Sequence, residues 1–270
     1  MLADVIAATE TPLTKHRLIG DLAALGVEPG QFVMLHVSMR SLGFVVGGAM
    51  TLLDAVIDRL GPTGTLMMPA HSTDLSDPAS WTNPPVPAAW VDTVREAMPA
   101  YDPARTPTWG LGVVPELFRT WPGTRRSDHP AVSLAARGPL AAQLVGTHPL
   151  DDPHGELSPL ARAYDLQVKV LLLGVGWTNM TLLHLAERRA RSAATPALAG
   201  APILRDGRRV WIQYRDYESD PERFAALGDA FLAAGQIKRG RVGSAQAFLI
   251  DGQVAVDIGA AQLADRKSVV

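Results

Sequence analysis

The sequence predicts an α/β fold in which a parallel or mixed sheet is covered by helices and is followed by an antiparallel α+β section. Two observations support the first part: apolar runs of strand length at 32–38, 65–69 and 169–175, and a stretch of helical periodicity between the first two runs. The third observation is the alternation of apolar and polar residues at 209–214, together with the hairpin-turn signal Asp251-Gly252 within 247–257, which are typical of antiparallel strands.

The first seventy residues predict the order helix, strand, helix, strand. Residues 16–25 are amphipathic and precede the strand at 32–38. The segment 49–60 has helical spacing of its apolar residues, Leu52, Leu53, Val56 and Leu60, and it leads to the strand at 65–69. A strand–helix–strand unit joins parallel strands, so we expect a parallel sheet covered by helices.

The middle of the chain predicts long loops. Many of the 21 prolines lie between Pro62 and Pro159, which favours irregular segments at about 70–110 and 146–165. Loops on a rigid scaffold often carry ligand-binding residues. The remaining helices are predicted at 90–98, 113–120, 140–145 and after the strand at 169–175.

The C-terminal third predicts an antiparallel section at about 200–260. It contains a strand at 209–214, a helix at 222–234 and a hairpin at 247–257, whose turn would be Asp251-Gly252. We find no internal repeat and no linker, so we expect one domain over residues 1–270.

Composition excludes several classes of function. The net charge of -2 argues against a nucleic-acid partner, because no broad basic surface is available to neutralise phosphates. The absence of cysteine excludes disulfides, thiolate nucleophiles and cysteine-ligated zinc. No signal peptide or membrane-spanning segment is evident, so we expect a cytoplasmic protein with no membrane contact.

A glycine-containing loop at 38–48 is the first candidate site. Glycines allow a ligand to approach the backbone, the following helix offers free N–H groups, and Ser38 and Ser41 add hydroxyls. The pattern fits an anion site, although it also fits an ordinary turn between a strand and a helix. It is not a P-loop, because the Gly-Lys-Ser/Thr ending is missing.

His184 is the second candidate, because it follows a predicted strand at the edge where α/β sheets bind ligands. Thr181 lies three residues before it and Glu187 three residues after it, so the three side chains share one helix face. A neighbouring carboxylate fixes the tautomer of an imidazole and raises its basicity. His184 is therefore either a general base or a buried structural histidine.

Acidic residues are grouped in the loops, at Asp74 and Asp77, at Asp151, Asp152 and Glu156, and at 216–222. They fit either a site for a polycation or ordinary solvated loops. Five histidines are candidates for a metal site, but no pair has the spacing of a helical zinc motif, so no metal is expected: His36, His71, His129, His154 and His184. A Gly-x-Ser-x-Gly elbow is absent, which argues against a serine hydrolase.

The motifs taken in order resemble those of the aminoglycoside 3-N-acetyltransferase family. In the first half they are His36-Val-Ser-Met-Arg-Ser-Leu-Gly43, Gly64-Thr-Leu-Met-Met-Pro69, Asn83-Pro-Pro-Val-Pro87, Asp102-Pro-Ala-Arg-Thr-Pro107 and Glu116-Leu-Phe-Arg119. In the second half they are Arg126-Ser-Asp-His-Pro130, Ser158-Pro-Leu-Ala-Arg162, Val170-Leu-Leu-Leu-Gly-Val-Gly176 and Leu183-His-Leu-Ala-Glu187. Each motif is weak alone, but the series covers most of the chain and is specific.

The resemblance implies transfer of an acetyl group from acetyl-CoA to the 3-amino group of an aminoglycoside antibiotic, on this family's own α/β fold. It implies that His184 is the general base, that Thr181 stabilises the oxyanion, and that Asp216 supports the base or contacts substrate. The coenzyme-binding residues implied are His36, Ser38, Arg40, Ser41, Leu42, Gly43, Arg126 and Ser127. Those implied to bind the aminoglycoside are Asp74, His154, Glu156 and Asp216.

One stretch departs from the family pattern. Members usually read Asn-Thr-Ser/Thr-Leu-His, whereas this chain reads Met180-Thr-Leu-Leu-His184, with Asn179 one position early. Either Glu187 or Asp216 would orient the base. Alternative hypotheses are a metal-dependent hydrolase and a non-catalytic binder of cationic small molecules, and the chain could be a monomer or a homodimer.

Overall fold

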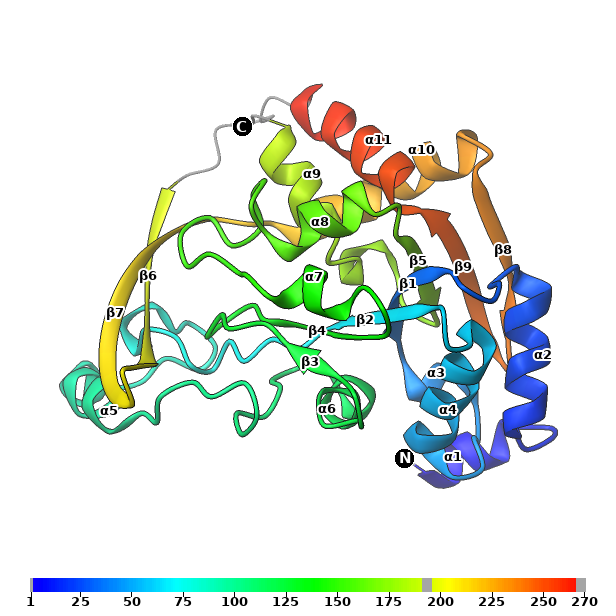
Figure 1. Cartoon of the computed structure of the whole chain (residues 1–270), viewed down its shortest axis with the longest axis horizontal. Coiled ribbons are helices and arrows are strands. Elements are labelled where there is room, and N and C mark those ends of the chain that lie inside the picture. The colour runs from blue at the N-terminus through cyan, green and yellow to red at the C-terminus, as the bar shows by residue number, and fades with distance from the viewer. Residues whose placement is uncertain (1, 191–195, 266–270) are drawn as a thin grey trace.

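The computed structural model describes residues 2–190 and 196–265, and its centre is a seven-stranded sheet in the order β3-β4-β2-β1-β5-β9-β8 (Figure 1). A separate hairpin, β6–β7, forms a second sheet at the left of Figure 1. The strands are β1 (Phe32–Val37), β2 (Thr65–Pro69), β3 (Arg125–Arg126), β4 (Leu134–Arg137), β5 (Lys169–Leu173), β6 (Pro196–Arg205), β7 (Arg208–Tyr217), β8 (Ile237–Val242) and β9 (Ala245–Asp251).

Helices and 3₁₀ turns connect these strands. The helices are α1 (Leu2–Ala7), α2 (Lys15–Leu25), α3 (Met39–Leu42), α4 (Gly48–Leu60), α5 (Val91–Ala97), α6 (Val113–Arg119), α7 (Ala141–Val145), α8 (Pro159–Asp165), α9 (Leu183–Arg189), α10 (Gly228–Ala233) and α11 (Gly252–Asp265). The 3₁₀ turns are Pro78–Ser80, Ala88–Trp90, Trp177–Asn179 and Pro221–Leu227. Among the helices of the described residues, none has the length and apolar character needed to cross a membrane.

The three central strands are parallel, and the outer strands are antiparallel to their neighbours. Strand β1 pairs with β2 from Phe32 opposite Thr65, and with β5 from Val33 opposite Lys169. Strand β4 runs antiparallel to β2, and β9 runs antiparallel to β5. The predicted fold class is confirmed: a mixed sheet with helices and an antiparallel C-terminal part. The carboxyl ends of β1, β2 and β5 consequently meet at one edge.

Both faces of the sheet are covered, which explains why its central strands are apolar throughout. On β1, Val33 and Leu35 belong to one core with α2, α4 and α6, whereas Phe32 and Met34 belong to a second core with α7, α8, α9 and α11. Because side chains alternate along a strand, His36 is directed to the second face. The His36 side chain therefore lies on the face of the sheet against which α9 packs.

The predicted hairpin at 247–257 is wrong, because the chain becomes a helix where the turn was expected. Strand β9 ends at Asp251, and α11 begins at Gly252. The Asp251 carboxylate accepts the backbone N–H groups of Gln253 and Val254, which is how a side chain caps the start of a helix. The Asp-Gly pair fits this cap as well as a turn, and Val256 is buried on the helix.

We expect the substitution Gly174→Ala to lower the free energy of unfolding by about 1–3 kcal/mol. Gly174 has a φ of 66°, and an added Cβ would lie 2.3 Å from Cβ of Ser41. Gly176→Ala is the matched control, because nothing lies within 4 Å of its Cβ position. Urea unfolding of both variants checks this; equal stability of the two would contradict it.

Candidate active site

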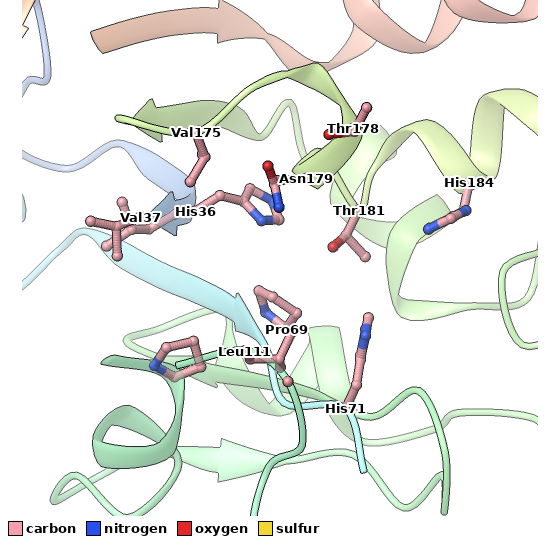
Figure 2. A pocket seen from close by; sticks show the side chains of 13 residues that line it. His36, Val37, Pro69, His71, Leu111, Val175, Thr178, Asn179, Thr181 and His184 are labelled. Carbon is pink, nitrogen blue, oxygen red and sulfur yellow. The ribbon is translucent and has the colours of Figure 1, made fainter. Parts of the chain in front are cut away.

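A cavity of about 230 Å³ opens at the carboxyl ends of β1, β2 and β5. This is the edge at which open α/β sheets bind ligands. Figure 2 shows side chains from β1 and β2, from the segment that follows β5 and from the turn before α9 around this cavity. The lining residues are Leu35, His36, Val37, Pro69, His71, Gly110, Leu111, Pro115, Val175, Thr178, Asn179, Thr181 and His184.

His184 is held by hydrogen bonds in the first turn of α9. Its Nδ1 lies 2.9 Å from Oε2 of Glu187, one helical turn later, and 2.9 Å from the Ser219 hydroxyl. Ser219 donates to the same Glu187 oxygen over 2.6 Å, and the Asp220 N–H donates to the other over 3.1 Å. Glu187 accepts the proton of Nδ1, which leaves Nε2 as the basic atom.

The environment keeps Glu187 ionised and directs His184 towards the cavity. Burial acts to raise the pKa of Glu187, but the hydrogen bonds from His184 and Ser219 outweigh it and hold the pKa below its usual value. The His184 ring points into the cavity (Figure 2). His154 stacks on it with 4.7 Å between ring centroids, and Phe224 meets it edge-on at 5.2 Å. These contacts fix the plane of the ring.

Asp216 is near this group but does not contact it by a hydrogen bond. Its Oδ1 accepts the backbone N–H of Tyr217, and burial raises the pKa of its carboxyl group. Glu187 is thus the carboxylate that contacts His184, and Asp216 is not among the residues that line the cavity.

The apolar residues that depart from the family pattern at 179–182 are accommodated in the core. Met180 and Leu182 are fully buried in the second core, so neither lines the cavity. Thr181 is 6% exposed and lines the cavity together with Asn179. Asn179 therefore supplies an amide at the cavity wall even though it lies one position early in the sequence.

The glycine-containing loop lies beside the cavity and forms the short helix α3. Ser38 caps this helix, and the Ser41 hydroxyl lies 2.9 Å from Oγ of Ser38 and 3.0 Å from the carbonyl oxygen of Gly174. Leu42 is buried, Arg40 is exposed, and Gly43 has a φ of 94°. These contacts tie the loop to the end of β5, which is adjacent to β1.

Arg126 and Ser127 have partners inside the protein and do not line the cavity. The Arg126 guanidinium donates to the carbonyl oxygens of Ala70 and Thr106. The Ser127 hydroxyl is fully buried, accepts the Leu134 N–H and lies 2.9 Å from Nδ1 of His148. Both residues connect loops around the site, and neither presents a free group to a ligand there.

The acidic residues at 151–156 are paired with arginines. Asp151 pairs with Arg215, Asp152 with Arg188, and Glu156 with Arg189. The hydrogen bond from Arg189 lowers the pKa of Glu156. These pairs fasten the loop to α9 and β7, which limits the role of Glu156 in binding a cation.

Asp74 has a different environment. Its Oδ1 is buried and has no partner among the described residues, and burial raises the pKa of its carboxyl group. Asp74 is not among the residues that line the cavity.

Three histidines have a buried Nε2 without a hydrogen-bond partner among the described residues: His36, His71 and His154. Burial lowers the pKa of His36 and of His71 to about 3, and lowers that of His154 well below its usual value. No cluster of His, Asp and Glu suited to a metal occurs in the described part of the chain. The sequence analysis indicated His71 only as a candidate metal ligand. It did not identify Ser219 as a site residue, because no sequence pattern marks this serine apart from the acidic residues around it.

Comparison with known proteins assigns the family. A family model described as aminoglycoside 3-N-acetyltransferase matches residues 34–264. The chain belongs to this family. The resemblance seen in the sequence motifs is therefore confirmed over most of the chain.

Similar members of the aminoglycoside 3-N-acetyltransferase family include curated proteins and solved structures. The aminoglycoside N(3')-acetyltransferase-like protein YokD of Bacillus subtilis is 42% identical, over 94% of this chain and 93% of its own length. Aminoglycoside N(3)-acetyltransferase IX of Micromonospora chalcea is 39% identical, over 89% of each chain. The structure of AAC-IIIb bound to CoASH has a TM-score of 0.85 and 33% identity, covering 96% of this chain and 99% of that chain. Enzymes so named are acyltransferases.

We expect the stability of this family member to fall as the pH drops from 6.5 towards 4. The pKa values of His36 and His71 are about 3 and that of His129 about 4, so below pH 6.5 the unfolded chain binds protons that the folded chain does not. Each such histidine contributes a slope of up to about 1.4 kcal/mol per pH unit in that window.

Urea unfolding at several pH values measures this slope, which the double substitution of His36 and His71 by leucine reduces. His16→Leu, at an exposed position on α2, is the matched control. A slope that the double variant does not change would contradict the assignment of buried neutral histidines.

Proposed function

We propose that the protein transfers the acetyl group of acetyl-CoA to the 3-amino group of an aminoglycoside, and so confers antibiotic resistance. The observation that carries this proposal is the arrangement of His184. Its Nδ1 is held by Glu187 and Ser219, and its ring faces a cavity at the carboxyl edge of the sheet. A base that is oriented in this way suits proton removal from an attacking amine.

The reaction proceeds by direct transfer in a ternary complex. The amine nitrogen attacks the thioester carbon, and the carbonyl electron pair moves to oxygen. His184 accepts the proton that the nitrogen loses. The intermediate then collapses, the C–S bond breaks, and the proton passes from His184 to the departing thiolate, which gives the amide and CoASH. Thr181, which lines the cavity, supplies a hydroxyl to the oxyanion.

An acyl-enzyme is not needed for this transfer, and the chain has no cysteine that could form a thioester with the acetyl group. The coenzyme would lie along the loop 38–43, with Arg40 exposed to receive its phosphates. The CoASH complex of AAC-IIIb supports coenzyme binding by this fold. Use of acetyl-CoA also fits a cytoplasmic location.

The aminoglycoside would bind on the side of Asp74, His154 and Asp216. Such antibiotics carry several ammonium groups, and carboxylates that lack an arginine partner attract them. Asp74 and Asp216 fit this requirement, because neither has a salt bridge within the described ranges. Glu156 would act mainly through its pair with Arg189.

We expect His184→Ala to reduce the rate of CoASH release by a factor of about 10²–10⁴, the usual effect of removing a general base. The measurement follows free thiol from purified protein, acetyl-CoA and a panel of aminoglycosides. His16→Ala is the matched control, because this histidine is exposed on α2. A variant rate within threefold of the wild type would contradict the role of His184.

We expect Glu187→Gln and Asp216→Asn to affect different kinetic constants. In Glu187→Gln, the neutral amide cannot hold the Nδ1–H tautomer of His184 as a carboxylate does, so kcat should fall about tenfold or more with little change in KM. Asp216→Asn removes a charge without disturbing His184, so KM for the aminoglycoside should rise most. Steady-state kinetics of both variants separates the roles, and a reversed pattern would make Asp216 the orienting residue.

A further inference from the structure

His36 is a buried polar side chain whose Nε2 has no partner among the described residues. It is 5% exposed, lies on the central strand β1 and lines the cavity. Its Nε2 is buried and has no hydrogen-bond partner in the described part of the chain. Buried polar groups are almost always hydrogen-bonded, so a lone one at a cavity wall is expected to find its partner in a ligand.

The chemistry of this imidazole is restricted by its environment. Burial and the nearby His184 lower the pKa of His36 to about 3, so the ring is uncharged at neutral pH. An imidazole with a pKa near 3 is too weak a base for this reaction, but in its neutral form it still donates one hydrogen bond from the ring nitrogen that carries the proton. A neutral histidine can polarise a carbonyl group in this way.

The position of His36 indicates which part of the bound substrates its side chain would contact. Strand β1 continues directly into the loop 38–43, proposed here to hold the coenzyme, while Thr181 and His184 line the same cavity. The thioester has to lie between that loop and the base. Figure 2 shows the His36 ring and the Thr181 hydroxyl directed into the same part of the cavity.

We propose that Nε2–H of His36 donates a hydrogen bond to the thioester carbonyl oxygen and, together with Thr181, stabilises the oxyanion. This inference rests on the proposed acetyl transfer. As the amine lone pair forms the C–N bond, the carbonyl π electrons move to the oxygen that His36 contacts. When the C–S bond breaks, those electrons re-form the carbonyl of the amide. His36 keeps its proton throughout, and proton transfer belongs to His184.

His71 also lines the cavity and also has a buried Nε2 without a partner within residues 2–190 and 196–265, but its position favours another role. It follows β2 and begins the loop that carries Asp74. This loop would lie on the aminoglycoside side. A donor on a central strand is also more rigidly placed than one on a loop, and rigid placement is what oxyanion stabilisation requires.

Kinetics of His36→Leu and His36→Gln provides the first test. Loss of one oxyanion donor typically costs about 10²–10³ in kcat, so His36→Leu should show that decrease while KM for acetyl-CoA changes by less than about threefold. Gln retains an N–H near the position of Nε2 and should recover part of the loss. Equal activity of the leucine variant and the wild type would overturn the proposal.

Infrared spectroscopy of bound acetyl-CoA labelled with ¹³C at the thioester carbonyl provides the second test. A hydrogen bond lowers the carbonyl frequency, so the shift seen with the wild type should disappear in His36→Leu and persist in His71→Leu. A merely structural role of His36 would not move this band. Loss of the shift in His71→Leu instead would assign the donor to His71 and overturn the proposal.

Failure of the proposed acetyl transfer and failure of the proposed role of His36 give different results in these experiments. If the wild type neither binds acetyl-CoA nor releases thiol with any aminoglycoside, the proposed function fails. If the wild type binds and turns over, but His36→Leu keeps both the carbonyl frequency and kcat, only the role of His36 fails. Binding of CoASH, which has no carbonyl at that position, should be unchanged in His36→Leu and controls for local folding.

Discussion

The parallel pairing of β1 between β2 and β5 is the constraint on which the site depends. Strands that run in one direction bring their carboxyl ends to one edge, so the loops after Val37, Pro69 and Leu173 converge there. Close contact between two of these loops requires Gly174, whose missing side chain leaves room for Ser41. The place of the cavity thus follows from strand direction, and the contact between the two adjacent loops from one glycine.

Among the described residues, some of the acidic side chains around this edge of the sheet are paired with arginines, and others are not. Arg188 and Arg189 of α9, the helix that carries His184, pair with Asp152 and Glu156. The loop that holds His154 is thereby fastened to the helix of the base, and the stacking of His154 on His184 follows from that attachment. The carboxylates proposed to bind a cationic substrate are those without such a pair in the described part of the chain, and acidic composition alone does not distinguish the two groups.

Local sequence patterns were sufficient to predict contacts between residues that are close both in sequence and in space. The spacing of His184 and Glu187 predicts their contact, because residues three apart meet on a helix. The same kind of reasoning failed at 247–257. There the Asp251-Gly252 pair is compatible with a hairpin turn and with the start of a helix, and the structure has the helix, with Asp251 as its cap and Val256 buried on it. Arg126 likewise carries a family motif, yet its donors bind backbone carbonyls of distant loops.

The sequence by itself determined the α/β class, most of the central elements, the family resemblance and the candidate base. These features follow from apolar periodicity and from motifs, which are local properties of the chain. Only the tertiary structure decided which acidic residues are neutralised, that Ser219 joins His184 and Glu187, and that Nε2 of His36, at the cavity wall, has no partner in the described part of the chain. Each of these depends on contacts between segments far apart in sequence, and a hydrogen bond or a buried orphan atom exists only once those segments have packed together.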